Sequence, residues 1–134
     1  MLDASATLPW CFADEATDAT NALLTRLRTS DQAIVPDYWN TEVANALLMA
    51  IRRKRISRQD TLQFLEDLLA LPVRIEATAI SLLIERIIPL AEQYQLTAYD
   101  AGYLELALSN SLPLATLDTD LRRAARAERV ELLL

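Results

Sequence analysis

Short apolar runs alternate with longer segments of helical periodicity along the whole chain, and this alternation limits the fold more than any other feature. The apolar runs are Ala33–Val35, Val73–Ile75, Leu112–Thr116 and Val130–Leu133. Largely apolar strands that alternate with helices are typical of a parallel sheet that is buried on both faces. The sequence therefore predicts an α/β fold, a three-layer α/β/α sandwich with a central and mainly parallel sheet.

The expected elements follow one another without a linker, an internal repeat or a low-complexity segment. A very short first strand is expected to end at Asp3, and a small polar segment, Ala4–Thr7, follows it. Helices are expected over about 14–28, 40–53, 58–71, 79–94, 98–109 and 120–127, the first capped by Asp14 or Thr17. In the helix over 79–94, a kink is expected at Pro89, and the residues expected to face inward are Leu83, Ile84, Ile87, Ile88 and Ala91.

Length and hydropathy favour one domain over residues 1–134. The chain is 52% hydrophobic, which is enough for one sizeable core and argues against disorder. No apolar run approaches the roughly 18 to 20 residues of a membrane span, and the N-terminus does not resemble a signal peptide. We therefore expect a cytoplasmic protein without a membrane partner. Its single cysteine, Cys11, excludes an internal disulfide.

Two residue types are nearly or wholly absent, and this limits the chemistry. The chain has no histidine, which excludes serine–histidine–aspartate and cysteine–histidine catalysis and histidine-ligated zinc. Its only glycine, Gly102, excludes a glycine-rich phosphate loop. The groups that remain are carboxylates, hydroxyls, arginines and one lysine, which favour a hard metal ion held by oxygen ligands.

Four carboxylates are placed where predicted elements begin or end. Asp3 ends the first strand, Asp118 follows the strand at 112–116, and Glu42 and Asp100 lie in the first turns of helices. Ligands bind beyond the carboxyl ends of parallel strands, so these acids are expected to share one edge of the sheet. Oxygen ligands there would suit magnesium or manganese.

Each acid except Asp3 also has a local explanation. Asp100 is three residues after Thr97 and can complete a capping box, and Glu42 can complement a helix dipole. Asp118 or Asp120 can be an ordinary N-cap of the helix that follows. Asp3 has no helix terminus that obviously awaits it.

Taken together, the pattern resembles the PIN-domain ribonucleases, and within them the toxins of VapBC-type toxin–antitoxin pairs. The similarity extends to about residue 125. It rests on Asp3-Ala-Ser5 with Trp10-Cys11-Phe12, Pro36 followed by Glu42-Val-Ala-Asn45, Thr97-Ala-Tyr-Asp100-Ala-Gly-Tyr103-Leu-Glu-Leu-Ala107, and Leu112-Pro-Leu-Ala-Thr116-Leu-Asp118.

The resemblance implies an acidic quartet around magnesium or manganese, with Asp3, Glu42, Asp100 and Asp118 as ligands. It makes Ser5, Asn45 and Thr116 supporting polar residues, whereas Asp120 is either a fifth acid that reaches the metal through water or the N-cap of the last helix. The implied activity is endoribonuclease cleavage by metal-activated water, with RNA as substrate and a cognate antitoxin as partner.

Two other kinds of domain share part of this pattern. A non-catalytic PIN-fold binding module would keep the fold without the nuclease activity. A phosphoacceptor receiver-like domain also gathers acids at strand ends, but it needs a lysine near the last strands, and the only lysine is Lys54 in the middle of the chain.

The basic and aromatic residues do not decide which surfaces bind RNA or a protein partner. The net charge is −6, but arginines cluster at Arg52–Arg58 and Arg122–Arg129, where they can contact RNA backbone or, at 52–55, complement a helix C-terminus. The aromatic residues are expected mainly in the core. Exposed apolar faces near Leu62–Leu69 would serve a homodimer or an antitoxin peptide.

Overall fold

The strands of the computed structural model, which describes all of residues 1–134, are parallel throughout. Strand β1 (Ala33–Pro36) pairs with β2 (Val73–Glu76), with Ala33 opposite Val73. Single parallel bridges, Leu2 with Ala115 and Leu114 with Leu132, continue the sheet beyond β1, and the Leu2 amide donates to the Ile34 carbonyl. The expected strands at the N-terminus, 112–116 and 130–133 are therefore in the sheet, but each is only a bridge.

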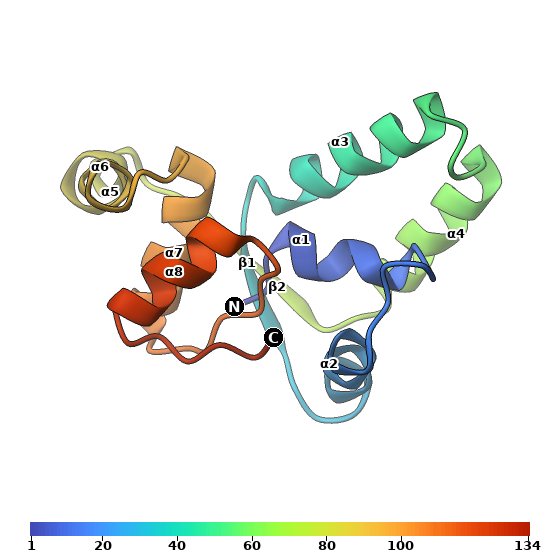
Figure 1. Cartoon of the computed structure of the whole chain (residues 1–134), viewed down its shortest axis with the longest axis horizontal. Coiled ribbons are helices and arrows are strands. Elements are labelled where there is room, and N and C mark those ends of the chain that lie inside the picture. The colour runs from blue at the N-terminus through green and yellow to red at the C-terminus, as the bar shows by residue number, and fades with distance from the viewer.

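The helices cover the strands on both sides. Figure 1 shows α1 to α4 on one side of the central strands and α5 to α8 on the other, which confirms the predicted three layers. The bounds are α1 (Ala4–Thr7), a 3-10 turn η1 (Leu8–Trp10), α2 (Asp18–Thr29), α3 (Trp39–Arg52), α4 (Arg58–Leu69), α5 (Ile80–Leu82), a π-helical turn η2 (Leu83–Ile87), α6 (Ile88–Tyr94), α7 (Ala98–Asn110) and α8 (Thr119–Ala127). No helix has the length and apolar character that a bilayer crossing requires.

Side-chain caps fix where four of these helices begin. The hydroxyls of Thr17, Ser57 and Thr97 accept from backbone amides at the starts of α2, α4 and α7. Thr17 rather than Asp14 therefore caps the first long helix. The carboxylate of Asp118 caps α8, so the expectation that Asp120 is the N-cap is wrong, because the helix begins one residue earlier than its apolar period indicates.

The segment after Asp3 also differs from the expectation. Ala4–Thr7 forms the helix α1 directly after Asp3, which has an extended backbone with φ −84° and ψ 153°. The Asp3 side chain makes no capping hydrogen bond to this helix. Its carboxylate therefore remains available to other partners.

The core lies between the strands and the two helical layers. Fully buried residues of the sheet segments, Leu2, Val35 and Leu114, meet fully buried residues of α3, α7 and α8, namely Leu47, Leu104 and Leu121. This packing fixes the beginnings of α3, α7 and α8 relative to the ends of the strands.

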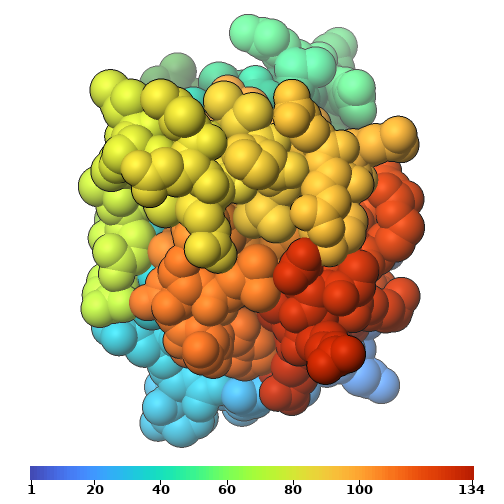
Figure 2. Space-filling model, turned by 90° about the vertical axis from the view of Figure 1, so that its left-hand side faces the viewer, coloured from blue at the N-terminus to red at the C-terminus, as the bar shows by residue number.

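The helical run from Ile80 to Tyr94 does not pack as expected. Ile87 is buried, but Ile84 is 68% exposed, Ile88 is 49% exposed and Leu83 is partly exposed. The π-helical turn before Pro89 places more residues in one turn than an α-helix does, so the apolar face changes direction within the run. Figure 2 shows this run, in yellow, as the outer layer of its side of the molecule.

Candidate metal centre

Asp3 is held in place by two hydroxyl groups. Its carboxylate is buried, and Oδ2 accepts hydrogen bonds from Ser5 Oγ and from Thr116 Oγ1, the latter at 2.6 Å. Ser5 Oγ also accepts from the Leu117 amide at 2.9 Å, and so it ties the start of α1 to the segment after Thr116. Both predicted supporting hydroxyls therefore contact Asp3.

Glu42 lies in the first turn of α3 and is held by a tyrosine of α7. The Tyr103 hydroxyl donates to Glu42 Oε2 at 2.6 Å, and the Tyr103 side chain is completely buried. Tyr103 is not among the site residues that the sequence predicts. Its spacing from Asp100, three residues along the same helix, was a usable signal, because residues three apart share a helix face.

Asp100 and Asp118 each perform the local role that the sequence suggested. Thr97 Oγ1 donates to Asp100 Oδ2 at 2.6 Å and accepts from the Asp100 amide at 3.1 Å, which is the predicted capping interaction. Asp118 Oδ1 accepts from the Leu121 amide at 2.7 Å. These bonds orient the two carboxylates but use only one oxygen of each.

In each of the four carboxylates, one oxygen accepts hydrogen bonds from the protein and the other accepts none. The oxygens without a protein hydrogen bond are Oδ1 of Asp3, Oε1 of Glu42, Oδ1 of Asp100 and Oδ2 of Asp118. None of the four acids forms an ion pair, although the chain has 13 basic residues. A protein group that fixes one side of a ligand while the other side stays free is the usual arrangement around a bound metal ion.

The four negative charges also act on one another. Burial raises the pKa of Asp3, of Glu42 and of Asp100 above the ordinary value, and the hydrogen bonds from Ser5, Tyr103 and Thr97 oppose this rise. The charge of Asp100 further raises the pKa of Asp3 and of Glu42, and the charge of Asp118 raises that of Asp100. The acids therefore form one electrostatically coupled group, which a divalent cation would relieve.

The donor set fits magnesium or manganese that is held partly through water. No three acidic side chains lie close enough together to grip a metal ion directly. Magnesium in proteins usually keeps several waters and is held by one or two carboxylates together with substrate phosphates. Oxygen donors at the ends of strands, without nitrogen or sulfur, suit such an ion.

The remaining candidates lie at the border of this group. Asn45 follows Glu42 by one turn of α3, is exposed and makes no side-chain hydrogen bond. Asp120 forms an ion pair with Arg123 at 2.5 Å, and its charge contributes to the raised pKa of Asp100. Asp120 is therefore neither a cap nor a direct neighbour in the buried part of the site.

Four surface pockets lie outside the acidic group. Their volumes are about 330, 390, 410 and 600 Å³, and other residues line them.

Comparison with known proteins identifies the family of the chain. The family model of the PIN domain matches residues 1–127. The chain belongs to the PIN domain family. PIN domains are generally nucleases and typically use divalent metal ions.

The fold of this PIN domain also matches a solved structure. The crystal structure of PAE2754 from Pyrobaculum aerophilum is similar with a TM-score of 0.71 and 23% identity, over 92% of this chain and 76% of that chain. No curated protein matches the sequence.

Proposed function

We propose that this PIN domain is a magnesium- or manganese-dependent endoribonuclease, the toxin of a VapBC-type toxin–antitoxin pair in the cytoplasm. One observation supports the proposal above all. Four carboxylates from four separate segments are electrostatically coupled, have no cationic partner and each keep one free oxygen.

In this proposal Asp3, Glu42, Asp100 and Asp118 hold the metal ion, some of them through water. The ion would lower the pKa of a bound water and stabilise charge on the phosphate oxygens. Ser5 and Thr116 keep Asp3 in its orientation, and Tyr103 and Thr97 do so for Glu42 and Asp100. Attack by water would leave 5′-phosphate and 3′-hydroxyl ends, without a histidine.

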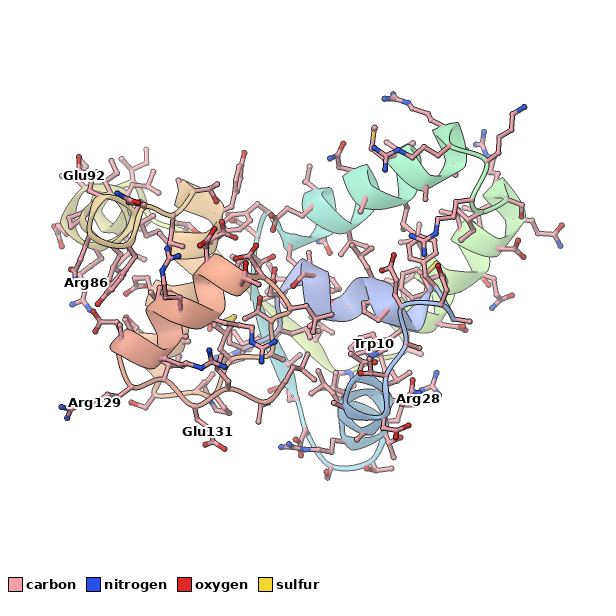
Figure 3. All side chains as sticks on the ribbon, viewed as in Figure 1. Trp10, Arg28, Arg86, Glu92, Arg129 and Glu131 are labelled. Carbon is pink, nitrogen blue, oxygen red and sulfur yellow. The ribbon has the colours of Figure 1, made fainter.

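The turn between α3 and α4 supplies a surface for the RNA backbone. Its cations Arg52, Arg53, Lys54 and Arg58 are exposed and form no ion pair. Unpaired arginines bind phosphate well, because the guanidinium fork can reach two oxygens. In the other cluster, Arg129 lies far from this turn (Figure 3) and Arg123 is paired with Asp120, so we assign backbone contact to the α3–α4 turn.

Two apolar surfaces support the proposed protein partners. The α5–α6 run exposes Ile80, Ile84 and Ile88, which supports a homodimer. A groove of about 410 Å³ between α3, α4 and β2 is lined mainly by apolar residues and includes Trp39. This groove supports the proposed antitoxin peptide, because its apolar lining would bury apolar side chains of the peptide.

Cleavage of single-stranded RNA tests the proposal. Protein purified free of any inhibitor is expected to cut the RNA when manganese is added, and Asp100→Asn is expected to abolish cleavage. Asp60→Asn is a matched control, because Ser57 and Asp60 form the same capping interaction at the start of α4, also with distances of 2.6 and 3.1 Å.

Equal cleavage by the wild type and Asp100→Asn would refute the assignment. Loss of cleavage in both Asp100→Asn and Asp60→Asn would show that the cap and not the acid matters. A wild-type protein that binds RNA without cutting it would favour the non-catalytic PIN-fold module.

A further inference from the structure

Tyr99 departs from the expectation that the aromatic residues fill the core. It is 56% exposed, whereas every other aromatic side chain is buried or half-buried. Its hydroxyl makes no hydrogen bond within the protein, so the ring contributes little to the packing of the core. A large exposed ring is therefore free to contact a ligand.

The position of Tyr99 connects it to the acidic group. It immediately precedes Asp100 in the first turn of α7. Its ring meets Tyr38 edge to face, with ring centroids 5.2 Å apart, and Tyr38 meets Tyr103 at 5.6 Å in the same manner. Tyr103 in turn donates to Glu42. An aromatic series thus leads from the exposed ring to Glu42, and Asp100 follows Tyr99 along the chain.

The Tyr99–Tyr38 pair is held rigidly. The Tyr38 hydroxyl donates to the Tyr99 carbonyl at 2.8 Å. This position of Tyr38 requires a glycine opposite it, because a Cβ on Gly102 would lie 2.1 Å from the Tyr38 hydroxyl oxygen. Glycine weakens a helix, yet the only glycine of the chain is in the middle of α7. The need to make room for the Tyr38 ring therefore explains why a glycine stands at position 102.

We propose that Tyr99 is a stacking platform for a base of single-stranded RNA, next to the phosphate that is cut. This inference rests on the proposed nuclease function. An exposed and rigid ring stacks on any base at little cost in conformational freedom, and such stacking tolerates different sequences. Placed beside Asp100, it would fix the nucleotide relative to the acidic group. RNA is favoured over a protein partner because the ring packs on Tyr38, which in turn packs on Tyr103, the residue that holds Glu42.

Binding of single-stranded RNA that carries the fluorescent base 2-aminopurine tests this role without cleavage, in metal-free buffer. Stacking quenches this base, so wild type and Tyr99→Phe are expected to quench it with similar affinity. Tyr99→Ala and Tyr99→Leu are expected to lose most of the quenching and to bind roughly 5- to 100-fold more weakly. Tyr99→Leu separates loss of the aromatic face from loss of apolar volume.

Leu69→Ala is the control, because Leu69 is 86% exposed on α4 and belongs to no part of the acidic group. It is expected to bind as the wild type does. Unchanged affinity and quenching in Tyr99→Ala would overturn the stacking role, as would a shift in oligomeric state as its only effect. Manganese-dependent cleavage by the wild type is scored separately, so failure of the nuclease and failure of the platform give different results.

Discussion

The two ends of α3 carry opposite charges that the protein leaves without partners. At its beginning, Glu42 lies among three other acids, none of which pairs with an arginine. At its end, Arg52 and three nearby cations have no acidic partner. The helix dipole favours these signs at these ends, but it does not explain why both groups lack partners. Under the proposed function, the first end would bind a cation and the second a polyanion.

One face of α3 joins these two ends. Glu42, Asn45, Met49 and Arg52 follow the helical period on that face, and Arg52 Nη1 lies 3.8 Å from Met49 Sδ. Ten residues of α-helix separate Glu42 from Arg52 by about 15 Å. If RNA is cut at the acidic end, as proposed, the same strand can follow the helix to the basic end.

Glu42→Gln is expected to have the largest effect and to separate the two ends kinetically. We expect kcat for RNA cleavage to fall roughly 100-fold or more, since loss of an outer-shell partner alone costs about 10- to 100-fold. Arg52→Gln is expected to change mainly KM, because it touches the backbone away from the reacting phosphate. Equal effects of both variants on kcat would remove the distinction between the ends.

Neutralising the basic end is expected to weaken RNA binding by more than about tenfold at low salt. In the variant with Arg52, Arg53, Lys54 and Arg58 all changed to glutamine, the slope of log affinity against log salt should fall by up to about 3. Filter binding or fluorescence anisotropy at several salt concentrations gives this slope. An unchanged slope would mean that this turn does not contact the backbone.

Tyr103→Phe is expected to have an intermediate effect at the acidic end. It removes the hydrogen bond to Glu42 and keeps the buried ring. We expect manganese affinity to fall about tenfold and stability to fall by about 1 kcal/mol. Metal titration and urea unfolding measure the two quantities. A stability loss without any change in metal affinity would give Tyr103 a purely structural role.

The smallest expected effect is a pH dependence of stability in the metal-free protein. The folded-state pKa values of Asp3, Glu42 and Asp100 lie above the ordinary ones, so the folded chain binds protons more tightly than the unfolded chain. Their contribution to the free energy of unfolding is present below about pH 4 and is lost as pH rises through the raised values.

Asp3→Asn isolates this contribution from those of other acids. Relative to the wild type, the variant should gain stability as pH rises from about 4 to about 7 in urea unfolding without metal. Manganese should reduce the difference, because only the wild type keeps the full ligand set. A wild type that instead gains on the variant as pH rises would contradict the sign of the Asp3 shift.

Much of the fold was predictable because it depends on local signals. Thr17, Ser57 and Thr97 are strong caps, and the apolar period of α3 and the run at β1 survive in the structure. The helix α1 was missed because four residues are too few to show a period. Ile84 and Ile88 were expected to face inward but face solvent, because a π-helical turn shifts the apolar positions to another face of the helix. The apolar pattern of the sequence does not indicate this turn.

The candidate acids were predictable from their places at element ends, but the groups that orient them were only partly so. Ser5 and Thr116 come from distant parts of the chain and meet only in the folded protein. The choice between Asp118 and Asp120 as the cap depends on a two-residue difference in where α8 begins. The role of Gly102 depends on Tyr38, 64 positions earlier, and needed three-dimensional contact to appear.

Calorimetric titration with manganese tests the central claim most directly. The wild type is expected to bind the ion and Asp100→Asn is expected to show no binding. Asp60→Asn, which makes the same change at the equivalent capping position of α4, is expected to bind as the wild type does. Absence of binding in the wild type, or equal binding by Asp100→Asn, would contradict the assignment of the four carboxylates as a metal centre.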